Sequence, residues 1–134
     1  MMPRRQGFTM IEMIVVIVIL GVLAAVAMPR FLDVGTNARS AAMQGVVGAA
    51  ASAMTVNYAG CSLTGHLTGT QCRQISNCNQ IGTLLVGGLP TGYTPTALPI
   101  DGSDATVANG DEDDCTITGP DSVTGTFKGI AAGN

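Results

Sequence analysis

The hydrophobic positions divide the chain into three stretches. Residues 8–28 are apolar or small almost throughout, and Glu12 is the only ionisable side chain among them. At about 1.5 Å per residue, a helix of this length spans about 31 Å, close to the roughly 30 Å hydrocarbon core of a bilayer. The first stretch therefore predicts a helix that can cross a membrane.

A second helical pattern follows without a gap. Its apolar side chains recur every three or four residues, at Phe31, Val34, Ala38, Ala42, Val46, Ala49, Ala53 and Val56. This spacing predicts an amphipathic continuation of the helix over residues 31–60, running to about Tyr58 with Gly60 as its stop. Pro29 removes one hydrogen bond, so we expect it to kink the helix without ending it.

The third stretch, residues 61–134, is rich in Gly, Thr, Ser and Asn. Short β-type runs at 83–86, 106–108, 115–118 and 122–127 predict a small antiparallel sheet, and the last two runs predict a hairpin. The segment around Pro95 and Pro99 is expected to be an extended connection. Together with the helix, the pattern predicts an α+β fold in which the second half of the helix packs on the sheet.

Composition narrows the classes of function. A chain of 134 residues with one His and no Trp has little material for a His-centred active site or an aromatic-lined pocket. An enzyme is therefore the weakest class, and we expect no cofactor. The net charge of −3 argues against a nucleic-acid partner, although a local patch around Arg39, Arg73 and Lys128 stays open.

Three interpretations of the amino-terminal stretch compete. Arg4 and Arg5 place its amino end on the cytoplasmic side by the positive-inside rule, which suits a plain signal anchor. Residues 25–27, Ala-Val-Ala, also fit the cleavage pattern of a secretory signal peptide. Neither interpretation explains Glu12, because a carboxylate inside an apolar span costs about 2.5 to 3.5 kcal/mol and needs a partner or a function.

The third interpretation accounts for this acid. The run Gly7-Phe8-Thr9-Met10-Ile11-Glu12, followed by an uncharged stretch up to Pro29, resembles the start of a type IV prepilin. Further along, residues 29–58 are similar to pilins of the mannose-sensitive haemagglutinin (MSHA) type. The resemblance implies the pilin fold, in which a long amino-terminal helix packs by its second half on a small antiparallel sheet.

The resemblance also implies how the chain is processed. Residues 1–7 would be a leader that a prepilin peptidase removes by cleavage between Gly7 and Phe8, and Phe8 would then be N-methylated. Residues 8–30 would remain as the transmembrane and filament-core helix. In the filament, Glu12 would neutralise the Phe8 amine of the next subunit, because a buried ion pair costs less than either charge alone. Gly21 and Pro29 would bracket a segment that melts on assembly.

The function that follows from the resemblance is that of a structural subunit of a type IV pilus. Such a chain waits in the inner membrane as a single-pass precursor and polymerises with copies of itself into an extracellular filament used for adhesion or motility. Its partners would be the prepilin peptidase, the assembly ATPase and the platform protein. The alternatives are a type II secretion-type pseudopilin and a minor or tip pilin with an adhesive or DNA-uptake role.

Three glycines interrupt the amphipathic helix, at residues 35, 45 and 48. Each lowers the helix propensity by about 1 kcal/mol relative to alanine, so each needs a packing reason. We favour close approach of the globular sheet over a seam between subunits.

The third stretch holds four cysteines, Cys61, Cys72, Cys78 and Cys115. An even count in an exported, loop-rich region predicts two disulfides, and of the three possible pairings we favour Cys61 with Cys72 and Cys78 with Cys115. The rival is a zinc site that adds His66, which is disfavoured because no pair has the C-x2-C spacing.

An acidic run at residues 111–114 raises the question of calcium, which takes six to eight oxygen ligands. Asp111, Asp113 and Asp114 are weak candidates, because the order of residues is not that of an EF-hand. We therefore expect a solvated loop and no metal.

Overall fold

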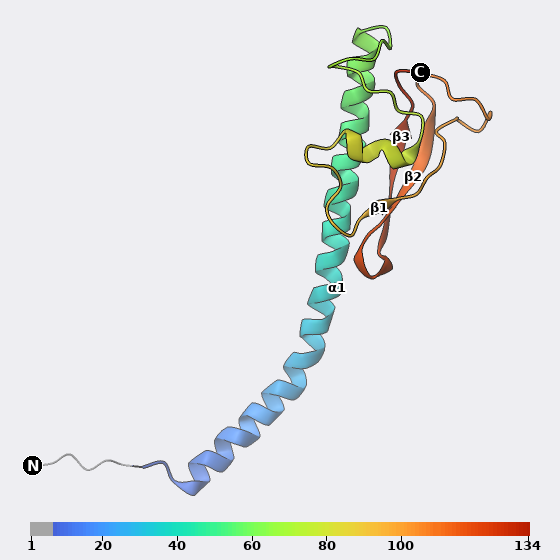
Figure 1. Cartoon of the computed structure of the whole chain (residues 1–134). Coiled ribbons are helices and arrows are strands. Elements are labelled where there is room, and N and C mark those ends of the chain that lie inside the picture. Colours follow the sequence, from blue (N-terminus) through green and yellow to red (C-terminus); the bar gives the residue numbers. More distant parts are fainter. Residues whose placement is uncertain (1–6) are drawn as a thin grey trace, which may run out of the picture. The chain divides into compact units, whose positions relative to one another are not determined.

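The computed structural model describes residues 7–134 (Figure 1). The elements are helix α1 (Met10–Leu63), 3-10 helix η1 (Cys78–Thr83), strand β1 (Thr94–Pro95), strand β2 (Glu112–Thr118), 3-10 helix η2 (Pro120–Ser122) and strand β3 (Thr124–Ile130). The chain divides into two compact units, Met1–Ala38 and Arg39–Asn134. The predicted α+β class is confirmed.

The first unit consists of the first half of α1 and the residues before it. Every side chain from Phe8 to Phe31 is exposed except that of Ala27, which is half-buried. Over its most apolar 18 residues the mean hydropathy of α1 is 2.9, and by length and composition α1 can cross a membrane. A helix that is apolar on all sides requires burial in something other than water. The helix continues through Gly21 and Pro29, so Pro29 does not end it.

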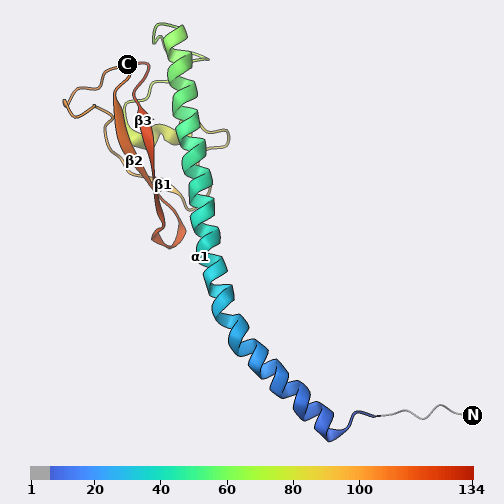
Figure 2. The same cartoon turned by 180° about the vertical axis from the view of Figure 1, so that it is seen from behind.

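In the second unit, the carboxy-terminal half of α1 packs on the sheet, and Figures 1 and 2 show β2 and β3 beside it. Met43, Ala50 and Met54 form the buried face of this part of α1, at the spacing of a helical stripe. They pack into one core with Ile117 and Phe127 from the sheet. Full burial of a methionine such as Met54 contributes about 1.5 to 3 kcal/mol.

The sheet has the order β1-β2-β3 with antiparallel neighbours. Cys115 and Ile117 of β2 are buried while their neighbours are less so, which is the period of two expected for a strand with one covered face. The predicted hairpin is confirmed as β2 and β3, and both strands are longer than predicted. Residues 94 and 95 form a two-residue strand at the edge, where a proline is tolerated.

Glycine lets β3 approach α1 closely. A Cβ atom added at Gly125 would lie 2.6 Å from Val47 Cγ2 and 2.8 Å from Met43 Cγ. A Cβ atom added at Gly129 would lie 2.5 Å from Cys115 Sγ. Real Cβ contacts are longer, so a larger residue at Gly125 forces the strand and the helix apart, and one at Gly129 presses on the Cys78–Cys115 disulfide and on Ile100.

Two disulfides tie the second unit together. Cys61 is joined to Cys72 across a separation of 11 residues, and Cys78 to Cys115 across 37. This is the pairing favoured from the sequence, and it excludes the zinc alternative because the thiols are used. Cys61, Cys72 and Ala132 form a second small core with Tyr58 packed against it.

Several predictions of local structure are wrong. Helix α1 does not stop at Gly60 but continues to Leu63. Gly60 is needed for packing, because an added Cβ atom would collide with the backbone carbonyl oxygen of Gln71. Tertiary contact, and not helix termination, therefore explains this glycine.

Two of the four predicted strands are absent from the described residues. Residues 83–86 form the last residue of η1 and the turn after it, because Asn77 and Gln80 form a capping box that starts this 3-10 helix upstream. Residues 106–108 form a loop in which Asp104 accepts hydrogen bonds from the backbone N–H and the hydroxyl of Thr106. This local turn competes with strand pairing.

The favoured interpretation of the helix glycines is also wrong. A Cβ atom added at Gly35, Gly45 or Gly48 would meet nothing within 4 Å. The sheet therefore does not approach the helix at these positions, and no packing within the described residues requires glycine there.

Candidate assembly site at the start of the helix

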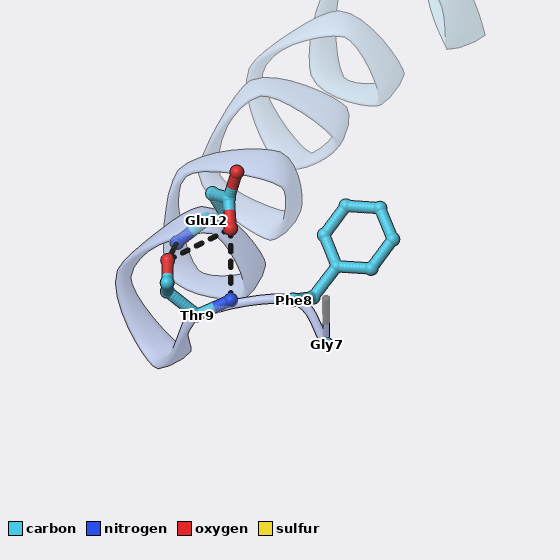
Figure 3. Close-up of a pocket in the computed structure, with 4 residues that line it drawn as sticks. All are labelled: Gly7, Phe8, Thr9 and Glu12. Atoms are coloured by element: carbon cyan, nitrogen blue, oxygen red, sulfur yellow. Dashed lines mark hydrogen bonds between the residues drawn. The ribbon is translucent and has the colours of Figure 1, made fainter. Parts of the chain in front are cut away.

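The first residues of α1 are joined by reciprocal hydrogen bonds (Figure 3). Glu12 Oε2 accepts from the backbone N–H and from the hydroxyl of Thr9, both at 2.8 Å. The backbone N–H of Glu12 donates to Thr9 Oγ1 at 3.4 Å. Thr9 directly precedes α1, so this arrangement is a capping box, which satisfies backbone N–H groups that lack an intrahelical partner.

The hydrogen bonds from Thr9 reach only one of the two carboxylate oxygens of Glu12. A negative charge in the first turn is stabilised by the partial positive charge of the helix N-terminus. Between residues 7 and 134, the hydrogen bonds of the Glu12 carboxylate all go to Oε2. Oε1 is therefore available to a donor from another molecule.

Gly7 and Phe8 lie just before the helix and, with Thr9 and Glu12, line a shallow hollow. Phe8 is 78% exposed, and its ring stands apart from the hydrogen bonds between Thr9 and Glu12 (Figure 3). Gly7 is exposed as well. Both residues that flank the Gly7–Phe8 peptide bond are thus exposed.

The structure brings Gly7, Phe8 and Glu12 together at one end of α1 and adds Thr9, which the sequence reasoning missed. The signal for Thr9 is the T-x-x-E pattern before an apolar run, which is the sequence form of the capping box. Gly21 and Pro29 lie elsewhere in α1, within unbroken helix. Residues 1–6, which include Arg4 and Arg5, lie outside the described residues.

The acidic candidates for calcium are engaged within the chain. Asp113 Oδ2 accepts from the backbone N–H of Asp101 and of Gly102, at 2.9 and 3.0 Å. Asp111 Oδ2 accepts from the backbone N–H of Ala108. Across residues 7–134, no group of three His, Cys, Asp or Glu side chains is arranged to hold a metal ion. The geometry therefore gives the calcium alternative no support.

Two of the three cations considered for a nucleic-acid patch have acidic partners. Arg39 Nε lies 2.7 Å from Asp121 Oδ2, and Lys128 Nζ lies 2.9 Å from Asp114 Oδ1. The hydrogen bond and charge of Asp114 raise the pKa of Lys128 above its usual value. Charges compensated in this way attract phosphates weakly, so the geometry does not support a DNA site.

The fold and the start of α1 define a class of protein. Its members have an exposed apolar amino-terminal helix, an acid in the first helical turn and a small disulfide-bonded domain. Comparison with known proteins agrees. Residues 2–28 match the family model described as the prokaryotic N-terminal methylation motif. No solved structure matches the chain.

Two relatives are type IV pilins by name, and the first, which the chain covers over most of its length, shows the family. The chain is 36% identical to the type IV narrow pilus major component PilA5 of Thermus thermophilus over 115 residues, which cover 86% of this chain and 88% of the relative. It is 53% identical over 30 residues to the type IV major pilin protein PilA of Myxococcus xanthus, covering 22% of this chain and 14% of that protein. The chain belongs to the type IV pilins and is a pilus subunit.

Proposed function

We propose that this pilin is made as a membrane precursor and becomes competent for assembly when its leader, residues 1–7, is removed. Cleavage between Gly7 and Phe8 releases a new amine at Phe8, which is then N-methylated. The exposure of Gly7 and Phe8, which lie within the matched methylation motif, supports this step. The partner that performs it is a prepilin peptidase on the cytoplasmic side of the inner membrane.

The second step is pairing between copies. The new amine at Phe8 is a cation, and Glu12 is the only acid in the apolar stretch of residues 8–28. Glu12 keeps Oε1 free while Thr9 holds Oε2. We assign to Glu12 the role of accepting the Phe8 amine of the neighbouring copy, since the pair removes two isolated charges from an apolar filament core. Thr9 is a positioning residue that fixes the rotamer of Glu12 before assembly.

The observation that carries the proposal is the exposed apolar helix with a single acid, Glu12, in its first turn, where Thr9 holds it by hydrogen bonds. Residues 8–30 serve first as the membrane anchor and then as the filament core, and residues 31–60 continue the helix into the disulfide-bonded region, residues 61–134. Growth needs an assembly ATPase and a platform protein, and the product is an extracellular filament for adhesion or motility.

Gly21 and Pro29 bracket the segment of α1 that melts on assembly. We place the chain in the MSHA-type group on the similarity of residues 29–58.

A pilus subunit is favoured over a secretion pseudopilin. The relative that spans most of the chain is a narrow pilus major component by name. The two disulfides and the internal use of Asp111 and Asp113 also differ from what we expect of a calcium-binding pseudopilin.

The test substitutes Glu12 in the native host and compares the result with a matched substitution of Glu112. Glu12→Gln preserves shape and removes the charge, so the chain should be processed and present in the membrane but absent from filaments sheared from the cell surface. Glu112→Gln changes the chain's other glutamate, which is exposed on β2, and should leave the filament yield unchanged. Filaments of the Glu12→Gln chain at the wild-type yield would contradict the proposed pairing.

A further inference from the structure

An apolar groove lies in the second unit between α1 and the loop that follows η1. Its volume is about 350 Å³. The residues that define its floor and one wall are Ala42, Gly45, Val46 and Ala49 of α1, with Leu85 and Val86 of the loop. None of the residues lining it carries a charge, so the groove is suited to an apolar occupant.

The floor of the groove contains a glycine that the subunit does not need for its own packing. A Cβ atom added at Gly45 would meet nothing within 4 Å. Glycine at this helical position nevertheless costs about 1 kcal/mol relative to alanine. Because Gly45 also lines the groove, we look for its benefit in a contact that the isolated chain does not make.

One apolar side chain in the wall of the groove, that of Val86, is exposed to solvent. Val86 is fully exposed, at 107% of its reference area. The turn that carries it is closed by a hydrogen bond from Gly88 N–H to the Leu85 carbonyl oxygen at 3.0 Å, with positive φ angles of 85° at Gly87 and 78° at Gly88. These left-handed conformations favour glycine, so the turn is built to project Val86.

The chain itself provides an occupant of matching chemistry. Residues 13–28 of α1 are uncharged and apolar on all sides, all of them are exposed except the half-buried Ala27, and they need cover in a pilus. An apolar helix commonly binds in an apolar groove, and small residues such as Gly45 and Ala49 let two helices approach closely. Contact between two neutral apolar surfaces leaves no charge buried without a partner.

We infer that this groove binds the uncharged part of the apolar helix, residues 13–28, of a second copy of the chain, with Gly45 at the point of closest approach. A groove on one copy that takes a different surface of the next copy is a heterologous contact, and such contacts between identical chains generate open helical filaments. The inference rests on the proposed function, because it requires a filament of copies.

The first test fills the groove without disturbing the subunit. Gly45→Leu places a side chain in open space and improves helix propensity, so the thermal midpoint of the detergent-solubilised chain should stay or rise. In the host, the yield of sheared filaments should fall by about tenfold or more, because the added side chain overpacks the contact. Gly48→Leu is the matched control, since Gly48 also faces open space but does not line the groove, and its yield should equal that of the wild type.

The outcomes separate the two proposals. If wild-type chains form no filaments, the proposed function fails. If wild-type chains form filaments and Gly45→Leu chains form them equally well, only the groove inference fails. Equal loss with Gly48→Leu would also overturn it, because the effect would then not belong to the groove.

The second test identifies the occupant. A photo-cross-linking amino acid is placed at position 86, and cross-linked peptides from irradiated filaments are identified by mass spectrometry. We expect the cross-linked position to lie within residues 13–28 of a second copy. Cross-links to residues 39–134 of a second copy, to another protein, or none in intact filaments would overturn the assigned occupant.

Discussion

Helix α1 presents two different surfaces along its length. From Phe8 to Phe31 its apolar side chains are exposed, whereas Met43, Ala50 and Met54 are buried against the sheet. The same helix thus depends on surroundings outside the chain in the first unit and on the chain's own core in the second. Substitutions in the first unit should therefore affect assembly, and those in the second should affect unfolding.

The glycines show the same division. Gly125 and Gly129 lie where β3 leaves no room for a Cβ atom, while Gly35, Gly45 and Gly48 face open space. Glycine in the sheet is explained by packing within the subunit. Glycine in the helix is not, and for Gly45, which lines the apolar groove, we look for a partner in another copy.

The largest loss of stability should come from removing the disulfide that closes the longer loop, Cys78–Cys115. Replacing Cys78 and Cys115 by serine should destabilise the second unit by about 2 to 5 kcal/mol, because the unfolded chain gains freedom. Thermal unfolding of the full chain in detergent measures this loss. The Cys61–Cys72 pair closes a shorter loop, so its removal should cost less, and a larger cost there would contradict the ranking.

Truncation of a core methionine should have the next largest effect. Met54→Ala should lower the free energy of unfolding by about 2 to 5 kcal/mol, since the side chain is fully buried. Ile17→Ala in the exposed part of α1 should leave the unfolding of the second unit unchanged. Equal losses for the two variants would remove the distinction between the two parts of the helix.

Adding a methyl group to glycine should give effects of opposite sign. Gly129→Ala should destabilise the second unit by about 1 to 3 kcal/mol, because its Cβ atom would press on Cys115 Sγ. Gly48→Ala should stabilise α1 by up to about 1 kcal/mol through helix propensity. Urea titration of both variants measures the difference, and a loss of stability in Gly48→Ala would show that the space around Gly48 is occupied.

The smallest effects should come from exposed charges of the second unit. Hydrogen bonds from Thr106 lower the pKa of Asp104 below its usual 3.8, so this contribution to stability is present at neutral pH and is lost as the pH falls through that lowered pKa. Asp114 raises the pKa of Lys128 above its usual 10.5, so the contribution of that pair is lost only as the pH rises through the raised pKa.

The pH dependence has a direct check. Between about pH 5 and 9 neither Asp104 nor Lys128 should contribute to any change in the thermal midpoint, because neither group titrates in that range. The Lys128→Met variant should lose part of the decline in thermal midpoint that we expect of the wild type as the pH rises above 10.5. An unchanged alkaline decline would show that the ion pair does not contribute.

The sequence predicted those features that depend on local periodicity or on a fixed motif. The apolar run with Glu12, the amphipathic continuation and the β2–β3 hairpin all have such signals. Gly60 was misread because its role depends on the backbone of Gln71, which is distant in sequence. Residues 83–86 were misread because Asn77 and Gln80 start a 3-10 helix through side-chain caps.

The candidate site was predicted for a similar reason. Gly7, Phe8 and Glu12 belong to one short motif, so their closeness follows from the start of a helix. The groove at Gly45 could not be predicted, because it needs the loop of residues 85–90 to fold back onto α1. Sequence periodicity reports which residues share a helix face, and it does not report what covers that face.

The most direct test of the account is the intact mass and the amino-terminal peptide of filaments sheared from the native host. The account predicts a chain that begins at N-methylated Phe8 and carries both disulfides, Cys61–Cys72 and Cys78–Cys115. Such a chain retains the apolar helix and its Glu12. A chain that begins at Met28 would mean that an ordinary signal peptidase had removed the helix, and it would contradict assembly through α1.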